Sequence, residues 1–72
     1  MDETLNWESS YAIALRLKEA HPEADLMDVS LNMIYAWAIV LEGFEDDPAL
    51  ANDAILSAIY QDWLEEILHD PK

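Results

Sequence analysis

Four carboxylates lie within six positions of the chain: Glu42, Glu45, Asp46 and Asp47. Crowded carboxylates offer hard oxygen ligands, which suit calcium, magnesium, manganese or iron. The spacing does not fit an EF-hand, because no glycine follows three alternating acidic positions. We therefore predict that any metal ion held by Glu45, Asp46 and Asp47 binds weakly and with little discrimination. A purely structural alternative is that Asp47, which precedes a proline, caps a helix and contributes about 1 kcal/mol.

Other catalytic groups are sparse. The chain has no cysteine, which excludes a thiol nucleophile, a disulfide framework and a thiolate-held metal. His21 and His69 each lie near an expected helix C-terminus, where a protonated imidazole is favourable. The serines have no nearby base at a suggestive spacing, and no phosphate loop or nucleophile elbow occurs. We predict that the protein is not an enzyme and requires no cofactor.

The charge balance excludes whole classes of function. The 72 residues carry 16 acidic and 3 basic side chains, a net charge of −13. Such a surface repels nucleic acid and anionic membranes. The longest apolar run, Met33 to Leu41, covers about half a membrane span. The acidic N-terminus lacks the features of a secretion signal, and the absence of cysteine is typical of a reducing compartment, so we expect a cytoplasmic protein.

The expected architecture is mostly α: one compact three-helix domain over residues 1–72, similar to a winged helix, with little or no sheet. Residues 1–4 and 70–72 are expected to fray. The helices should begin at capping residues and cover, in order, about 9–20, 28–41 and 48–69. Ser9 or Ser10 would cap the first helix, Asp28 or Ser30 the second, and Asp47 the third.

Some boundaries and faces leave alternatives. Residues 39–41 could form a short strand instead of the end of the second helix, and Gly43 stands where a positive φ is expected. The second helix also carries an apolar back, which indicates burial on two sides or an interface. The expected core holds the three tryptophans and an apolar face of the third helix. These residues are Trp7 (which could also staple onto Ile13), Trp37, Ala51, Ile55, Ala58, Ile59, Trp63 and Ile67.

The order of the motifs resembles a known family. The chain reads Leu5-Asn6-Trp7, then Leu41-Glu42-x-Phe44-Glu45-Asp46-Asp47-Pro48, then N-x-x-I-L-x-A-I-x-x-x-W-L-E-E from Asn52. Over about residues 5–66 this pattern is similar to the IscX family, small acidic proteins of bacterial iron–sulfur cluster assembly.

The resemblance implies a modified winged-helix fold that does not bind DNA. It implies an adaptor whose acidic surface docks on a basic region of a cysteine desulfurase, with an iron–sulfur scaffold or a ferredoxin as further partners, and weak iron binding. The candidate contact residues carried over are Asp25, Glu42, Glu45, Asp46, Asp47, Asp53, Glu65 and Glu66.

The chain also departs from the family. The family has Asp-Pro where this chain has Asp25-Leu26, and a V-R-F-T-D stretch where it reads V-S-L-N-M over residues 29–33. A polar position of the second helix is Val40 here. The apolar back of that helix, Met33 with Ala36 and Val40, makes a homodimer a further expectation. Two other functions stay open: an iron-carrying or metal-responsive carboxylate protein, and a general acidic interaction module, such as an inhibitor of a basic enzyme.

Overall fold

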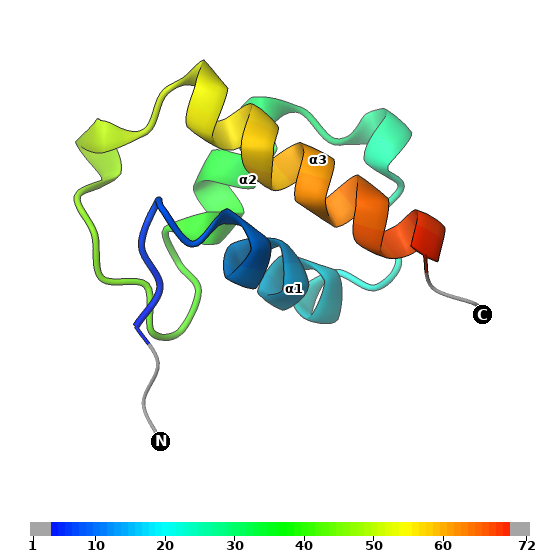
Figure 1. Cartoon of the computed structure of the whole chain (residues 1–72), viewed down its shortest axis with the longest axis horizontal. Coiled ribbons are helices and arrows are strands. Elements are labelled where there is room, and N and C mark those ends of the chain that lie inside the picture. Colours follow the sequence, from blue (N-terminus) through cyan, green and yellow to red (C-terminus); the bar gives the residue numbers. More distant parts are fainter. Residues whose placement is uncertain (1–3, 70–72) are drawn as a thin grey trace.

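The computed structural model describes residues 4–69 and contains three α-helices (Figure 1). They are α1 (Ser10–Ala20), α2 (Leu31–Ala38) and α3 (Asp53–His69), and two short 3₁₀ turns, η1 (Leu26–Asp28) and η2 (Pro48–Leu50), lie in the connections. The expected three-helix, mostly α fold is confirmed. The expectations for residues 1–3 and 70–72 lie outside the described residues.

No sheet forms within residues 4–69. The only β-type pairing there is an isolated parallel bridge between Leu5 and Phe44. It joins the segment before α1 to the loop after α2, which lie side by side at the lower left of Figure 1. The strand considered for residues 39–41 does not form, because these residues make a turn directly after α2.

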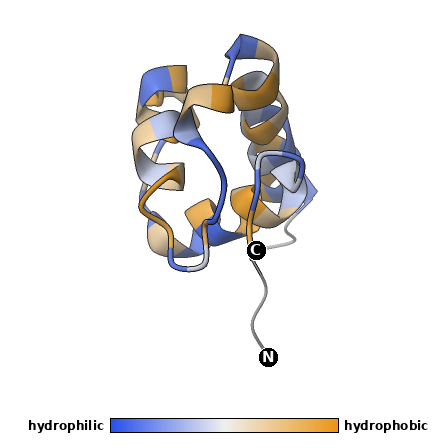
Figure 2. Cartoon of the chain, turned by 90° about the vertical axis from the view of Figure 1, so that its left-hand side faces the viewer, coloured by the Kyte–Doolittle hydropathy of each residue, from blue (hydrophilic) through white to orange (hydrophobic). Residues whose placement is uncertain are grey.

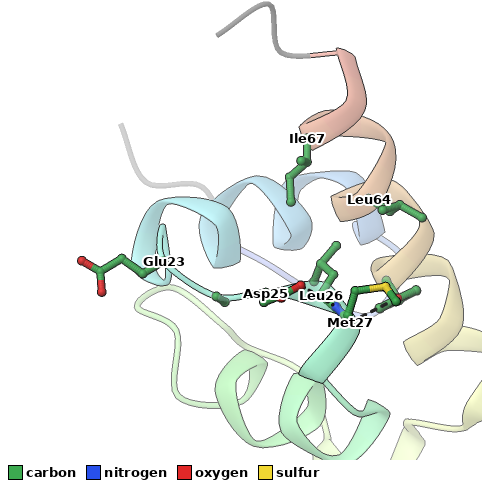
Figure 3. A pocket seen from close by; sticks show the side chains of 8 residues that line it. Glu23, Asp25, Leu26, Met27, Leu64 and Ile67 are labelled. Carbon is green, nitrogen blue, oxygen red and sulfur yellow. Dashed lines mark hydrogen bonds between the residues drawn. The ribbon is translucent and has the colours of Figure 1, made fainter.

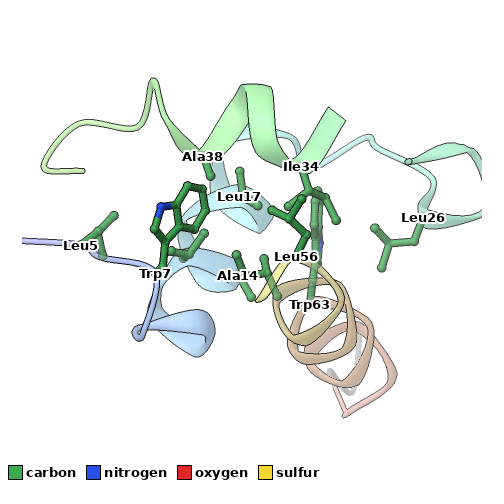
Figure 4. Close-up of a cluster of buried hydrophobic side chains, with 11 residues drawn as sticks. Leu5, Trp7, Ala14, Leu17, Leu26, Ile34, Ala38, Leu56 and Trp63 are labelled. Atoms are coloured by element: carbon green, nitrogen blue, oxygen red, sulfur yellow. The ribbon is translucent and has the colours of Figure 1, made fainter. Parts of the chain in front are cut away.

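α3 packs against both α1 and α2, and the core lies between the three helices (Figure 4). Each helix contributes fully buried side chains, among them Ile13, Leu17, Ile34, Ile59 and Trp63. Leu5 and Trp7 close one end of this core and Leu26 lies at the other end. The apolar periodicity of each helix therefore serves one shared cluster, as the sequence predicts.

α2 is shorter than predicted. It begins after Ser30, whose hydroxyl oxygen accepts a hydrogen bond from the Met33 N–H at 3.2 Å, and it ends at Ala38 instead of Leu41. Of the two caps considered, Ser30 is therefore the one used. The chain turns sharply after α2 and reaches Gly43, which has the expected positive φ of 89°. In this left-handed region a Cβ atom would crowd the backbone.

The third helix begins at Asp53, so the prediction that it starts at Pro48 is wrong. Asp47 does cap a helical segment, but that segment is the single turn η2. Ala51 then has an extended backbone with ψ of 144°, which interrupts the helical path. A second cap follows, because the Asn52 Oδ1 accepts a hydrogen bond from the Ile55 N–H at 2.9 Å.

The buried face of α3 differs from the predicted one in three side chains. Leu56 is buried on α3, whereas Ala58 is exposed and Ile67 is 39% exposed. The staple of Trp7 onto Ile13 stays a prediction, and Trp7 is buried in the same core cluster as Ile13. The Trp7 ring packs edge-on against Phe44, with the ring centroids 4.8 Å apart, and stacks near Tyr35.

The other two tryptophans meet across the core. The ring centroids of Trp37 and Trp63 are 6.3 Å apart, with Trp63 buried and Trp37 half-buried. His21 follows α1 directly, as predicted. Its ring stacks on the Trp37 ring, with the two ring centroids 3.9 Å apart.

Candidate partner-binding surface

The acidic loop, residues 42–47, is held in place by the segment before α1. The Leu5 N–H donates to the Gly43 carbonyl at 2.8 Å, and the Glu45 N–H donates to the Leu5 carbonyl at 2.9 Å. The Trp7 indole N–H donates to the Asp47 carbonyl at 2.8 Å. We call residues 5–7 the clasp, because their hydrogen bonds fix the backbone of the acidic loop.

Both carboxylate oxygens of Asp46 accept backbone hydrogen bonds, and one of these bonds comes from the clasp. Its Oδ2 accepts a hydrogen bond from the backbone N–H of Trp7 at 3.0 Å, and its Oδ1 accepts one from the backbone N–H of Asp47 at 2.7 Å. Asp47 in turn caps η2, since its Oδ1 accepts a hydrogen bond from the Ala49 N–H at 2.9 Å. Both aspartates therefore stabilise the fold, and for Asp47 this agrees with the alternative that it acts as a helix cap.

The acidic loop does not present a preformed metal site. Nowhere within residues 4–69 do three histidine or carboxylate side chains gather in a way that could hold one ion. Metal binding by Asp46 would compete with the N–H groups that its oxygens already accept. Weak iron binding by Glu45, Asp46 and Asp47 stays a prediction.

Four of the predicted contact residues are exposed carboxylates with no internal hydrogen bond to the described part of the chain. They are Glu42, Glu45, Asp53 and Glu65. The acidic loop and the start of α3, which carry the first three, lie on the same side of the molecule, at the left of Figure 1. That side faces the viewer in Figure 2, where blue segments mark its hydrophilic residues. Carboxylates on it are available to a partner.

Asp25, Glu65 and Glu66 lie elsewhere, so the eight predicted residues do not form one patch. Asp25 caps η1 by accepting a hydrogen bond from the Met27 N–H at 3.0 Å, and it lies beside the C-terminal half of α3. Glu65 and Glu66 are on that half of α3. The Glu66 Oε1 accepts a hydrogen bond from the Tyr11 hydroxyl at 3.0 Å. This bond and the charge of Glu66 raise the pKa of Tyr11 above its ordinary value.

Nothing in the sequence pattern predicts the structural role of Asp62. The Asp62 Oδ2 accepts a hydrogen bond from the Ser10 hydroxyl at 2.7 Å and so links α3 to the first turn of α1. The two residues are 52 positions apart, and no spacing rule relates them. Together with the Tyr11 to Glu66 bond, it places two acidic side chains of α3 in the contact with α1.

The lysine and arginine side chains of residues 4–69 lie on one helix. Among the described residues the only lysine and arginine are Lys18 and Arg16, both on α1. From position 19 to position 71 the sequence has no lysine or arginine, but it carries 13 of the 16 acidic residues. The surface formed by α2, α3 and their connections therefore has a strongly negative potential, with α1 as the less negative side.

This small, acidic three-helix fold can be compared with known families. A family model described as iron-sulphur cluster assembly matches residues 5–68. The chain belongs to the IscX family. The resemblance seen in the motif order is therefore confirmed, and the protein's function lies in iron–sulfur cluster assembly.

A relative supports this placement at the level of sequence. An uncharacterized protein of Pseudomonas aeruginosa is 35% identical over 63 residues, which cover 88% of this chain and 96% of the relative. Members of the family are generally accessory proteins that do not catalyse a reaction themselves. Within residues 4–69, no helix has the length and apolar character needed to cross a membrane.

Proposed function

We propose that this IscX-family protein is a non-catalytic adaptor that docks on a basic surface of a cysteine desulfurase and modulates sulfur delivery in cluster assembly. The observation that supports it best is the combination of a net charge of −13 with exposed carboxylates that have no hydrogen-bond partner within residues 4–69. A side chain that is not needed to hold the fold is available to hold a partner.

The charge distribution supports a preferred orientation of docking. The acidic loop carries Glu42 and Glu45 in solvent, while Arg16 and Lys18 lie on α1. In the field of a positive partner the molecule would turn the acidic loop toward the partner and α1 away from it. Such steering accelerates association and weakens as salt screens the charges, over about 10 Å at 0.1 M ionic strength.

Two double variants test the proposal at equal net charge. Glu42→Gln with Glu45→Gln removes the free carboxylates of the acidic loop. Glu19→Gln with Asp28→Asn removes two exposed carboxylates elsewhere, and each variant changes the net charge by two units. The affinity of each for the purified desulfurase would be measured from low to physiological ionic strength.

We expect the Glu42/Glu45 variant to bind about fivefold more weakly at low salt, and the control variant to lose less than about twofold. The affinity of the unaltered protein should fall steeply with added salt. The proposal is wrong if the desulfurase does not bind, if binding ignores salt, or if the two variants lose the same affinity.

A further inference from the structure

An apolar groove lies between η1 and the C-terminal half of α3, at the other end of the molecule from the acidic loop (Figures 1 and 3). Its volume is about 410 Å³. Leu26 and Met27 form the wall on η1, and Leu64 and Ile67 face them from α3.

The backbone of η1 that carries one wall of the groove is fixed by hydrogen bonds. Leu26 is 6% exposed, and its carbonyl accepts a hydrogen bond from the Tyr60 hydroxyl at 3.2 Å, which ties η1 to α3. Asp25 caps η1 on the other side.

Apolar surface continues beyond the groove. Met27 is 88% exposed on its rim, and Leu68, one turn beyond Leu64 on the same side of α3, is 72% exposed. From Tyr60 to Leu68 the strip runs about 12 Å along α3. A strip of this length, longer than one side chain, matches about two turns of a partner helix lying along it.

The rim of the groove is negative. Glu23 and Asp25 line it, Asp28 ends η1, and no lysine or arginine occurs between positions 19 and 71. An apolar strip with an acidic rim is complementary to a helix that has apolar side chains on one face and lysine or arginine beside them. An acidic or uncharged helix would leave these carboxylates without a counter-charge.

We propose that this groove is a second docking site, and that its occupant is a basic amphipathic helix of a partner protein. The site goes beyond the desulfurase contact proposed above and lies on a different surface. An adaptor with both sites could hold a basic surface at the acidic loop and a basic helix at the groove at the same time.

A synthetic helical peptide is the probe. It is about 14 residues long, with leucines at i, i+4, i+7 and i+11 and lysines at most other positions. The control peptide keeps the lysines and has glutamine for every leucine. Binding to the full chain is followed by fluorescence anisotropy of the labelled peptide at physiological ionic strength, and the methyl resonances of Leu64 and Ile67 locate the site.

The protein variants are Met27→Gln and the matched control Val40→Gln. Both residues are highly exposed, at 88% and 75%, so neither substitution should disturb the fold, which circular dichroism checks. Met27→Gln should weaken binding of the leucine peptide about fivefold, and Val40→Gln by less than about twofold. The Glu42/Glu45 variant should still bind the peptide, so failure at one site is separable from failure at the other.

Three outcomes would overturn the groove proposal. Equal affinity for the leucine and glutamine peptides would mean that charge alone attracts the peptide. Equal loss in the Met27 and Val40 variants would place the contact elsewhere. Concentration-dependent shifts of the Leu64 and Ile67 methyl groups without peptide would show that a second copy of the chain occupies the groove.

Discussion

Asp46 allows a quantitative test of the difference between a structural and a surface carboxylate. Its two oxygens accept the N–H groups of Trp7 and Asp47, at 3.0 and 2.7 Å. In Asp46→Ala both donors lose their acceptor. The neighbouring variant Glu45→Ala removes the same charge from a side chain that has no internal hydrogen bond to the described residues, so it is the matched control.

The magnitude follows from the surroundings of the two bonds. The bond from the Trp7 N–H is partly buried, and an unsatisfied donor in such a place costs about 1–3 kcal/mol. The bond from the Asp47 N–H is exposed, so water replaces most of it and the loss is about 0.5 kcal/mol. We expect Asp46→Ala to lower the free energy of unfolding by about 2 kcal/mol relative to Glu45→Ala.

A loss of this size is easily measured in a small domain. A 72-residue protein has a total stability of about 4–11 kcal/mol, and 2 kcal/mol lowers its Tm by roughly 10 °C. Urea unfolding followed by tryptophan fluorescence gives the free energy for both variants. If Asp46→Ala proves as stable as Glu45→Ala, the clasp does not stabilise the acidic loop and the structural role of Asp46 is refuted.

Three further predictions concern a cap, the core and a titration. Ser30→Ala should destabilise the protein by about 1 kcal/mol in urea unfolding, because the first turn of α2 loses its cap. Ile59→Ala, at a fully buried site, should cost about 3 kcal/mol in the same assay, and Ile67→Ala less than about 1 kcal/mol, because Ile67 is 39% exposed. Glu66→Gln should lower the pKa of Tyr11 in an absorbance titration of tyrosinate, because it removes the charge that opposes ionisation. The pKa of Tyr11 is raised in the folded protein. The stabilisation that comes from its hydrogen bond to Glu66 is therefore fully present below the ordinary tyrosine pKa, and it disappears as the pH rises through the folded pKa.

Each of these has a result that would contradict it. Unchanged stability of Ser30→Ala would show that the Met33 N–H is satisfied equally well by water. Equal losses at Ile59 and Ile67 would contradict the described core. A Tyr11 titration, obtained as the difference between the protein and its Tyr11→Phe variant, that is unchanged by Glu66→Gln would contradict the contact between the two side chains.

The elements that the sequence predicted well have local causes. α1 ends where the sequence predicts, because a proline directly follows His21. The predicted serine cap at its start is wrong, because Ser9 makes no side-chain cap hydrogen bond and the Ser10 hydroxyl donates to Asp62.

The start of α3 was missed because two capping signals follow one another. Asp47 with its proline and Asn52 each suit a helix start, and only the extended backbone of Ala51 separates η2 from α3.

The candidate site was harder to predict because its decisive contacts are distant in the sequence. Asp46 was assigned to partner and iron binding, but its main hydrogen-bond donor, the Trp7 N–H, is 39 positions away. The groove likewise depends on the meeting of Leu26 and Tyr60 across 34 positions. Composition and motif order identified the family and the acidic character, whereas the division between structural and available carboxylates required the fold.

The clasp also has a consequence for the thermodynamics of docking. A free loop with several like charges would have to be ordered when a partner binds, and each immobilised residue would weaken the complex. Here Leu5 and Trp7 already hold the loop backbone in the unbound protein. The backbone of the loop is already ordered during folding, so its ordering entropy does not have to be lost again when a partner binds.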